Sequence, residues 1–455
     1  MKVVKFGGSS LASGEQLEKV FNIVVSDPDR KVVVVSAPGK RYPDDIKVTD
    51  LLIACAEHVL DTGDGGEYFD AVIQRYTAIA NELEISNEII EVITDSLRSL
   101  LADRSKSHDH FIESVKASGE DNNAKLVAAY FQSRGVDAHY INPKEAGLLV
   151  SDEPGHAQVL PETYDNLYEL RKKSGIIVFP GFFGYSKKGD IVTFSRSGSD
   201  ITGSILANGV KAEVYENFTD VDAVCSVNPG IVKNPKEIRE LTYREMRELS
   251  YAGFSVFHDE ALMPAFHAGI PVHVRNTNNP DAQGTKIVNK RTNQNGPVVG
   301  IASDKGFCSI YVRKYLMNRE IGFGRKLLQI LEEFNLSYEH LPSGIDDISI
   351  ILRQDQMNLA FEKEMLKRIE NELGAEEVKI QHDLSLIMVV GEGMRCNVGT
   401  MARAAKTLAD IGVNIEMINQ GSSEVSMMFA VKEADEKKAV QALYDEFFVG
   451  VPVKS

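Results

Sequence analysis

A run of two glycines and two serines follows the apolar N-terminal segment and could hold a phosphate group. Residues 5–10 read Lys-Phe-Gly-Gly-Ser-Ser and lead toward a helical pattern. Glycines let a backbone approach a phosphate closely, a helix start offers unpaired N–H groups, and an adjacent lysine supplies positive charge. The spacing is neither a Walker A loop nor the dinucleotide fingerprint. Taken alone, the run predicts a phosphate site, and a purely structural turn stays open as the alternative.

A second run combines hydroxyl groups with an arginine at the expected start of a helix. Residues 195–200 read Ser-Arg-Ser-Gly-Ser-Asp and lead into an apolar segment at 201–208. Such an arrangement suits an anion, and the guanidinium fork can grip both oxygens of a carboxylate. The alternative is that Ser199 or Asp200 only caps the helix. Capping does not require an arginine, so we favour the anion site.

Two acidic features could contribute to the same chemistry. Residues 216–222, Glu-Asn-Phe-Thr-Asp-Val-Asp, follow a strand expected at 212–215, and a loop at the carboxyl end of a strand can hold a nucleotide. An ordinary acidic turn would have the same composition. Glu120, directly after Ser118 and Gly119, could pair with a substrate ammonium group or simply begin the next helix. Both alternatives stay open at this point.

The cysteines and histidines do not form recognisable catalytic or metal-binding patterns. The four cysteines are isolated in the sequence, which is typical of reduced thiols in a cytoplasm: Cys55, Cys225, Cys308 and Cys396. No histidine falls into a metal-ligand spacing, and we expect His258 and His267 to be structural residues on one helix. The sequence therefore predicts no metal site built by the protein itself.

The order of apolar and polar residues predicts the elements that position these groups. The chain has 455 residues, of which 43% are hydrophobic, enough for roughly three domains. Up to about residue 290, β-branched runs alternate with amphipathic helices, which favours a largely parallel sheet covered by helices on both faces. The clearest strands are 3–6, 31–36, 137–141 and 175–179, and residues 59–115 are expected to be a helical insertion. Leu17, Val20, Phe21 and Val24 would form the buried face of the first helix.

The charge balance and the apolar runs exclude some function classes. Lys and Arg total 50 against 66 Asp and Glu, a formal net charge of −16, so no general basic surface is available for a nucleic-acid backbone. No apolar stretch reaches the roughly 20 residues of a membrane span, and the N-terminus has no pattern of a secretion signal. We therefore expect a soluble, cytoplasmic protein that binds neither nucleic acid nor membrane.

The last third of the chain contains an internal repeat with an offset of about 77 residues. Residues 307–312 align with 384–389, Gly322 aligns with Gly399, and 347–349 align with 424–426. Each copy reads as β-α-β-β-α-β, closing with an amphipathic helix and a short strand. A stretch rich in Asn, Asp, Pro and Gly at 276–295 suggests a boundary near Gly296. The predicted domains are therefore 1–296, 297–378 and 379–455, with the initial strand of the second able to pair with the third.

These motifs, taken in their order along the chain, closely resemble those of the aspartate kinases, a branch of the amino-acid kinase family. The resemblance rests on Lys5-Phe6-Gly7-Gly8-Ser9, Arg196-Ser197-Gly198-Ser199-Asp200, Phe218-Thr219-Asp220-Val221 and the duplicated tail, and it spans essentially the whole chain. It implies an α/β fold in which an open α/β/α sandwich of amino-acid-kinase type precedes two ferredoxin-like ACT domains. It also implies transfer of the γ-phosphoryl group of MgATP to the β-carboxylate of L-aspartate, the entry to lysine, methionine and threonine synthesis.

The resemblance assigns roles to particular residues. It implies that Lys5, Arg196 and Asp200 are catalytic. ATP would be bound by Lys5, Gly7, Gly8, Ser9, Thr219 and Asp220, with Mg²⁺ arriving on its phosphates. Aspartate would be surrounded by Ser36, Thr49, Glu120, Phe182, Arg196 and Ser199, with Arg196 gripping a carboxylate and Glu120 facing the amino group. A feedback amino acid, lysine or threonine or both, would bind at Met317, Glu320, Ser337, Tyr338, Glu339, Asp346 and Asp347.

The chain departs from the family pattern near the expected nucleotide. Ser255 stands where many relatives have a lysine, Gly230 stands where they have an arginine, and Cys225 replaces an aromatic residue. Lys233 and Lys236 are nearby candidates to neutralise the triphosphate instead. We also expect a homodimer or higher homo-oligomer formed through the ACT domains.

Two alternatives belong to different classes. Another enzyme of the amino-acid kinase family, acting on N-acetylglutamate, glutamate, carbamate or UMP, would share the first glycine motif but not the duplicated tail. A catalytically weak amino-acid sensor would fit the changes at Gly230 and Ser255 but not the intact Lys5, Arg196 and Asp220.

Overall fold

The computed structural model describes residues 1–455 except 104, 196, 255, 256, 258, 259, 292–295 and 450–455. The chain forms two compact units, each built from several segments. The first contains Met1–Val224, Glu237–Arg247 and Ser255–Asn293, and the second contains Cys225–Lys236, Glu248–Phe254 and Gln294–Ser455. The predicted division at residues 296 and 378 stays a prediction. Within the described residues, no helix is both long and apolar enough to cross a membrane.

The first unit is built on an eight-stranded sheet with the order β3-β4-β2-β1-β7-β9-β10-β8. Its neighbouring strands are parallel except for β9 and β10. The strands are β1 (Lys2–Phe6), β2 (Arg30–Val35), β3 (Ala138–Tyr140), β4 (Ile176–Pro180), β7 (Tyr215–Thr219), β8 (Glu240–Thr242), β9 (Val272–Asn276) and β10 (Thr285–Val288). A separate two-stranded ribbon consists of β5 (Phe183–Tyr185) and β6 (Ile191–Thr193). The four clearest predicted strands therefore form as β1, β2, β3 and β4, with each end shifted by at most one residue.

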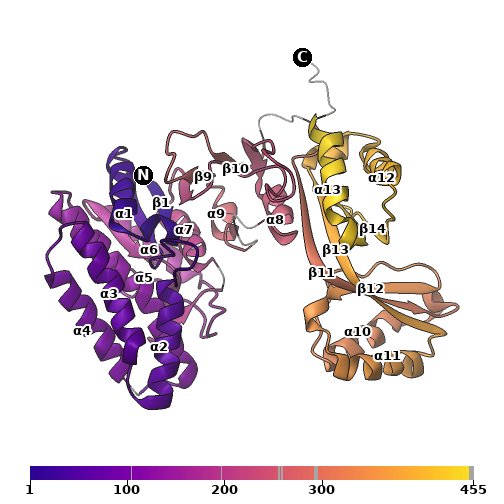
Figure 1. The fold of residues 1–455 in the computed structure, drawn as a ribbon, viewed down its shortest axis with the longest axis horizontal. Coiled ribbons are helices and arrows are strands. Elements are labelled where there is room, and N and C mark those ends of the chain that lie inside the picture. The colour runs from indigo at the N-terminus through magenta and orange to yellow at the C-terminus, as the bar shows by residue number, and fades with distance from the viewer. Residues whose placement is uncertain (104, 196, 255–256, 258–259, 292–295, 450–455) are drawn as a thin grey trace. The chain divides into compact units, whose positions relative to one another are not determined.

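Helices cover this sheet on both faces (Figure 1). The helices up to residue 268 are α1 (Gly14–Val25), α2 (Val48–Thr62), α3 (Gly66–Glu82), α4 (Glu88–Ala102), α5 (His108–Ser133), α6 (Glu162–Tyr168), α7 (Gly198–Gly209), α8 (Tyr243–Tyr251), whose last residues belong to the second unit, and α9 (Met263–Ala268). The first helix forms as predicted, with the Ser13 side chain accepting a hydrogen bond from the Gln16 N–H, and its apolar face is buried. The predicted helical insertion at 59–115 begins in the last turn of α2, contains α3 and α4, and ends within α5.

Successive side chains of β1 point alternately to the hydrophobic core and to the opposite face of the sheet. Val4 and Phe6 belong to the core shared with α1–α5, whereas Lys5 points to the opposite face, where α7 lies. Side chains of a strand alternate between the two faces of a sheet, so a lysine between two core residues must leave the core. Lys5 is thereby placed beside the N-terminus of α7.

The second unit contains a five-stranded sheet with the order β12-β11-β13-β15-β14. The strands are β11 (Gly300–Arg313), β12 (Asp347–Arg353), β13 (Glu377–Val390), β14 (Met417–Asn419) and β15 (Ser426–Lys432). The helices are α10 (Phe323–Glu333), α11 (Leu359–Leu373), α12 (Thr400–Asp410) and α13 (Glu436–Tyr444).

The two repeats share this sheet but have separate cores. Strands β11 and β13 are long, and each contributes one half to each core. Residues 307–313 pair with 377–384 beside the core of the first repeat, and residues 300–304 pair with 386–390 beside that of the second. The aligned glycines, Gly322 and Gly399, both precede a helix with left-handed backbone, at φ 83° and 91°. Glycine adopts this conformation without a steric penalty, which explains why it stands at this point of both copies.

Two details of the predicted repeat are wrong. The first copy has no regular strand directly after α10 in the described chain; isolated bridges at His340 and Ser343 occupy that place, whereas the second copy has β14. The second copy also has no closing strand within the residues described up to Val449, where a π-helical turn (Asp445–Val449) follows α13. The strand beside β13 in this copy comes instead from the beginning of β11.

Candidate active site

A cavity of about 840 Å³ lies in the first unit, at the carboxyl ends of its central strands. Ligands of open α/β sheets bind at this edge because the loops that follow parallel strands meet there. Lys5 is the penultimate residue of β1, Ser36 follows β2, and Phe182 follows β4. The lining residues are Lys5, Ser36, Thr49, Lys116, Glu120, Gly155, His156, Phe182, Phe194, Ser195, Ser197, Gly198, Ser199, Asp200 and Glu260. The structure therefore brings together every described residue that the sequence analysis assigned to aspartate.

Lys5 and Asp200 form an ion pair at one wall of the cavity. The Lys5 Nζ atom is 2.5 Å from Asp200 Oδ1, and both side chains are about nine-tenths buried. Asp200 Oδ1 also accepts a hydrogen bond of 2.6 Å from Asn217 Nδ2, which fixes the carboxylate from the neighbouring strand β7. Asp200 therefore orients the lysine ammonium group, and the alternative that it only caps α7 is wrong, because Ser197 is the N-cap residue.

The N-terminus of α7 approaches the segment that follows β4. Ser197 is the N-cap residue, at φ 61°, and its side chain makes no capping hydrogen bond. A Cβ atom at Gly181 would lie 2.5 Å from Ser199 Oγ, so only glycine allows this approach. Phe182 has φ 78°, and its backbone is held by Thr202 Oγ1 at 3.0 Å and by a bond from the Phe194 N–H. Such strain in a bulky residue is typical of functional sites. Arg196, predicted to grip a carboxylate, lies outside the described residues.

Glu120 lies in the middle of α5, so the alternative that it begins a helix is wrong. Its side chain is buried, and Oε2 has no hydrogen-bond partner. Burial raises the pKa of Glu120 to about 8, against the smaller lowering effects of backbone hydrogen bonds and of Lys116 and Lys5. A buried carboxyl group with a free oxygen needs a ligand that can donate hydrogen bonds. An ammonium group satisfies this need.

Lys116 and Glu113, both on α5, were not predicted. The Lys116 ammonium lines the cavity, 2.8 Å from Glu113 Oε1 and 5.5 Å from the centre of the Phe182 ring. The sequence signal was available only indirectly, because a residue four positions before Glu120 shares its helix face once both are known to be helical. His156 and Glu260 also line the cavity, and neither has a sequence signal that we can identify.

The predicted phosphate turn lies next to the predicted nucleotide residues. Gly7 N–H donates to the Phe218 carbonyl at 3.2 Å, because β1 and β7 are parallel neighbours in register. Thr219 at the end of β7 therefore lies close to this turn, and its hydroxyl contacts Asp220 at 3.1 Å. On the other side, the turn touches the loop after β2, with Gly39 N–H bonded to the Gly8 carbonyl at 2.8 Å.

One expectation about this region is wrong. Glu216, Asn217 and Phe218 lie within β7 rather than in a loop after it. Glu216 is buried and bonded to Arg30, at 2.7 Å, and to Arg275, at 2.9 Å. It supports the fold beside the site.

Comparisons with known proteins agree with this geometry. Residues 1–276 match the amino acid kinase family, and residues 387–447 match an ACT domain. Aspartokinase 3 of Bacillus subtilis is 71% identical over 451 residues, which cover 99% of each chain. This chain belongs to the aspartate kinases. Both the predicted family and the predicted fold class are confirmed.

Solved structures of aspartate kinases are similar over nearly the whole chain. The Clostridium acetobutylicum aspartate kinase, described as an allosteric enzyme, is 37% identical with a TM-score of 0.86, covering 98% of this chain and 99% of that one. Escherichia coli aspartokinase III in complex with aspartate and ADP is 25% identical with a TM-score of 0.78, covering 98% and 100%. The same enzyme in complex with lysine and aspartate is 26% identical with a TM-score of 0.77, covering 98% and 99%.

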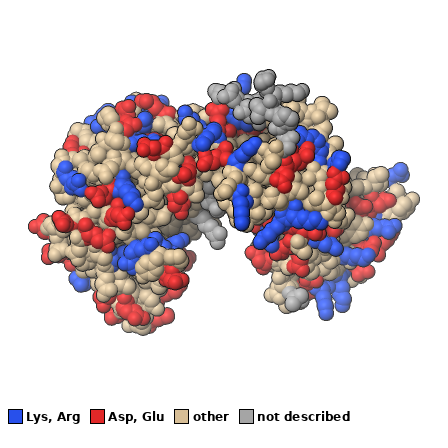
Figure 2. Space-filling view, turned by 45° about the horizontal axis from the view of Figure 1, so that its top comes forward, with Lys and Arg blue, Asp and Glu red and all other residues tan. Residues whose placement is uncertain are grey.

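The visible surface of this aspartate kinase carries charges of both signs. Figure 2 shows lysines and arginines interspersed with acidic residues over the visible face, without a continuous basic area. Lys236 was one of the two lysines suggested to neutralise the triphosphate. Its ammonium group donates a hydrogen bond to the Phe448 carbonyl within the second unit, which makes this role less favourable. Gly230 is exposed and bonded to Asn228 within the same unit, and Ser255 lies outside the described residues.

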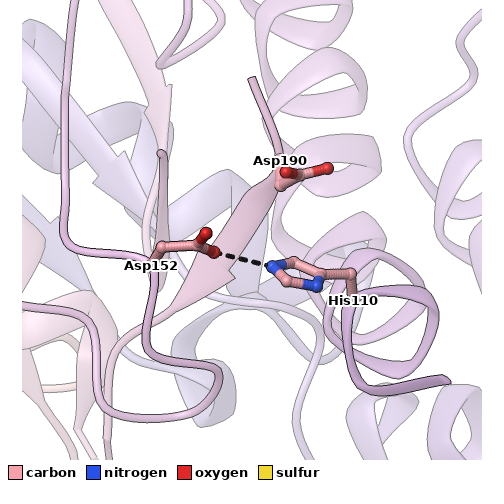
Figure 3. Close-up of side chains that lie close together, drawn as sticks. All are labelled: His110, Asp152 and Asp190. Carbon is pink, nitrogen blue, oxygen red and sulfur yellow. Dashed lines mark hydrogen bonds and ion pairs between the residues drawn. The ribbon is translucent and has the colours of Figure 1, made fainter. Parts of the chain in front are cut away.

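One group of metal-ligating side chains occurs among the described residues, and ion pairing explains it. His110, Asp152 and Asp190 lie close together (Figure 3). His110 Nε2 is 2.8 Å from Asp152 Oδ1, and the Lys188 ammonium is 2.8 Å from Asp152 Oδ2. His110 and Lys188 each contact one oxygen of Asp152, so the cluster ties the loop at 151–157 to α5. The expectation of no protein-built metal site stays a prediction.

The predicted effector residues fall into separate groups in the second unit. Met317, Glu320 and Asp346 lie near one another: Asp346 Oδ1 accepts from the Leu316 N–H at 2.7 Å, and Glu320 pairs with Lys314 and Lys326. Hydrogen bonds from these lysines lower the pKa of Glu320 to about 2.

The remaining effector residues lie around β12. Ser337 is bonded to Gln356, Tyr338 is half-exposed, and Glu339 accepts a hydrogen bond from the Tyr251 hydroxyl. Asp347 lines a cavity of about 260 Å³ together with Ser309, Ser343 and Glu416. Within one described chain the predicted residues therefore do not form a single pocket.

Proposed function

We propose that Lys5, the glycine turn and the α7 N-terminus align MgATP with the β-carboxylate of L-aspartate, giving 4-phospho-L-aspartate. The observation that carries this placement is Glu120, which lines the cavity and has a buried oxygen without a hydrogen-bond partner, as an ammonium ligand would require. Binding of aspartate and ADP by the E. coli enzyme, to which this chain is similar, supports the same pair of substrates.

The cavity suits a reaction between two anions. A carboxylate with an ordinary pKa of about 3.9 is already ionised at neutral pH, so the acceptor needs no general base. Phosphoryl transfer then depends on alignment and on positive charge around the moving group. Lys5, held by Asp200, supplies one fixed charge, and backbone N–H groups of residues 8 and 9 and of α7 supply dipoles. Arg196 would grip a carboxylate of aspartate.

The metal would arrive with the nucleotide. Mg²⁺ prefers phosphate oxygens and water over dedicated protein cages, and it would neutralise part of the triphosphate charge. Gly7, Gly8, Ser9, Thr219 and Asp220 would surround the phosphates and the nucleoside, which the adjacency of β1 and β7 supports.

A coupled assay of ATP consumption with different acceptors tests this function. L-aspartate, L-glutamate, N-acetylglutamate and UMP should be compared at equal concentrations with Mg²⁺ present. We expect consumption with aspartate and at most traces with the others. A preference for any other acceptor would contradict the proposal, and binding of aspartate without turnover would favour the weak sensor instead.

We also propose that lysine, alone or together with threonine, inhibits the enzyme through the first ACT repeat. The lysine complex of the E. coli enzyme supports this class of effector, and acidic residues suit an amino acid with two ammonium groups. Glu339 carries the proposal because its carboxylate connects Arg353, at 3.7 Å, and Tyr251.

Calorimetry on matched variants tests the effector site. Glu339→Ala should weaken lysine binding, whereas Glu332→Ala, an exposed change on α10, should not. Tyr251→Phe removes the hydroxyl donor but leaves the carboxylate, so it separates loss of the hydrogen bond from loss of the charge. Coupling between an effector site and a substrate site typically changes the affinity for each ligand by about 5- to 150-fold. No binding of lysine or threonine to the parent protein would refute the proposal.

Oligomer formation and location stay predictions. The five-stranded sheet ends at β14, whose outer edge pairs with no other strand of the described chain, and an open edge is a ready site for a second copy. Light scattering on the purified protein would measure the number of subunits. The cytoplasmic location was expected from the isolated cysteines, and the structure adds only that Cys55, Cys308 and Cys396 are free thiols.

A further inference from the structure

The helical insertion between β2 and β3 contains a buried guanidinium group, that of Arg75 on α3. Its side chain is only 4% exposed. The other buried residues of this helix include Val72, Tyr76 and Ile79, which pack in the apolar core. A buried charge is costly unless it is paired and hydrogen-bonded. The partners of Arg75 therefore indicate what this helix does besides packing.

Arg75 joins the two ends of the loop that follows β2, residues 38–47. One terminal nitrogen, Nη1, donates a hydrogen bond to the Gly39 carbonyl at 2.9 Å. The other, Nη2, donates to the Ile46 carbonyl at 3.0 Å and to Asp45 Oδ1 at 2.7 Å. The planar guanidinium group presents its donors in a fixed fork. A single side chain thus holds both ends of the loop at once.

Asp45 is the buried anion of this loop. Its carboxylate also accepts hydrogen bonds from Arg41, through the backbone N–H and Nε, both at 2.9 Å, and through Nη2 at 3.0 Å. Hydrogen bonds from Arg41 hold the pKa of Asp45 well below its usual range, although burial acts to raise it. The carboxylate therefore stays charged and connects the loop, through Arg75, to α3.

The loop end that Arg75 holds lies against the predicted phosphate turn. The Gly39 N–H donates to the Gly8 carbonyl at 2.8 Å, while the carbonyl of Gly39 accepts from Arg75. The contact leaves no room for a side chain, because a Cβ atom at Gly39 would lie 2.6 Å from the Gly8 carbonyl carbon. Gly39 therefore lies between the guanidinium group and the turn, with a hydrogen bond on each side.

We propose that Arg75 positions the phosphate turn for MgATP through Gly39, so that the helical insertion serves nucleotide binding as well as the fold. The inference rests on the proposed role of residues 7–9 around the phosphates. Arg75 is a positioning residue, because its partners are in the loop and the described lining of the cavity does not include it. The aspartate side has a separate support, since Asn123 Nδ2 donates to the Ser36 carbonyl at 2.6 Å. Loss of Arg75 should therefore weaken nucleotide binding more than aspartate binding.

Calorimetry with MgADP and with L-aspartate, measured separately on Arg75→Met, tests this proposal. Methionine fills part of the same space but has no donor for the Gly39 carbonyl. Misplacing an aligned group by about 1 Å can cost about 100-fold in rate. We therefore expect kcat/KM for ATP to fall by about 10- to 100-fold, with a higher Kd for MgADP and little change in the Kd for aspartate.

Two variants of the same insertion are matched controls. Tyr76→Phe removes a buried hydroxyl group from the next residue of α3, and its hydrogen bond, at 2.8 Å, goes to the Gly119 carbonyl on α5 rather than to the loop. Arg98→Met removes an exposed guanidinium group from α4. Both should keep the Kd of the parent for MgADP. Arg75→Lys keeps a charge for Asp45 but cannot reproduce the fork, so it should recover only part of the lost affinity.

Limited trypsin digestion separates release of the loop from general unfolding. The loop has three exposed cleavage sites, Lys40, Arg41 and Lys47. Local opening of a segment exposes its backbone to a protease without unfolding the rest of the domain. In Arg75→Met these three sites should be cut faster than in the parent, while the rate of cleavage elsewhere in the first unit stays unchanged.

A second variant at the contact gives an independent check. Because Arg75→Met and Gly39→Ala would both act through Gly39, the double variant should bind MgADP no more weakly than the weaker single variant. Additive losses would show that Arg75 acts by another route.

The proposal is overturned if folded Arg75→Met binds MgADP as tightly as the parent. It is also overturned if the affinities for MgADP and aspartate fall equally and cleavage becomes faster throughout the chain, which would assign Arg75 a role in stability alone. If Arg75→Met does not fold, the same comparisons on Arg75→Lys decide the question. Failure of the proposed function would look different, because the parent would then consume no ATP with aspartate, whatever the variants do to MgADP binding.

Discussion

Capture of aspartate should depend on pH through one carboxyl group, Glu120. Burial raises the pKa of Glu120 to about 8, so in the free enzyme this group is mostly protonated at neutral pH. An ammonium ligand requires the carboxylate form. The profile of kcat/KM reports the ionisation of the free enzyme, and it should therefore rise with pH until Glu120 is ionised.

The expected change in kcat/KM follows from the pKa of Glu120. With a pKa of about 8, roughly 1% of Glu120 is ionised at about pH 6, roughly 9% at about pH 7 and half at about pH 8. The kcat/KM for aspartate should then increase roughly 50-fold between about pH 6 and pH 8. Binding of aspartate at about pH 7 should release roughly 0.9 proton per site.

Two measurements check this prediction. Initial rates at saturating MgATP give the pH profile for aspartate, and calorimetry in buffers of different ionisation enthalpy gives the number of protons released. Glu120→Gln should bind aspartate more weakly and lose the Glu120 contribution to both measurements. His156→Gln is the control, because His156 also lines the cavity and carries an imidazole.

The reasoning would be refuted by a flat kcat/KM profile in the parent enzyme. It would also be refuted by an unchanged slope in Glu120→Gln, or by a slope that disappears in His156→Gln. The profile for ATP is an internal reference, since Glu120 is not proposed to contact the nucleotide.

Three further changes test the phosphate end of the site and the fold that supports it. Lys5→Ala should lower kcat by about 10²- to 10³-fold, because one positioned charge is lost, and a folded variant with normal turnover would contradict its role. Gly39→Ala would place a Cβ atom 2.6 Å from the Gly8 backbone, so it should displace the phosphate turn and raise the KM for ATP, whereas Gly324→Ala meets no atom within 4 Å and serves as control. Glu216→Gln should lower the free energy of unfolding by about 3–5 kcal/mol, because Arg30 and Arg275 lose their buried anion. Chemical denaturation measures this loss, and equal stability of variant and parent would show that the arginines find other partners.

Local patterns in the sequence predicted the elements of the first unit well. The apolar spacing of Leu17, Val20, Phe21 and Val24 predicted the buried face of α1, because periodicity depends only on neighbouring residues. The aligned Gly322 and Gly399 likewise predicted equivalent helix starts, since both need a left-handed backbone. The ends of the elements were predicted less accurately. Residues 216–218 were expected in a loop, but they belong to β7, because pairing with β1 and β9 extends this strand.

The sequence by itself determined which chemical groups are available: a glycine turn after Lys5, a serine-rich helix start before Asp200, and a carboxyl group at position 120. Only the tertiary structure decided what surrounds them. Lys5 and Asp200 are nearly two hundred positions apart in the chain and meet because β1 and α7 pack together, and Glu113 meets Thr193 across 80 positions. The pKa of Glu120 depends on desolvation by residues from distant segments, and no local pattern encodes that burial. A short-range pattern can specify a residue and its helix face, but distance and dielectric environment arise only when the chain has folded.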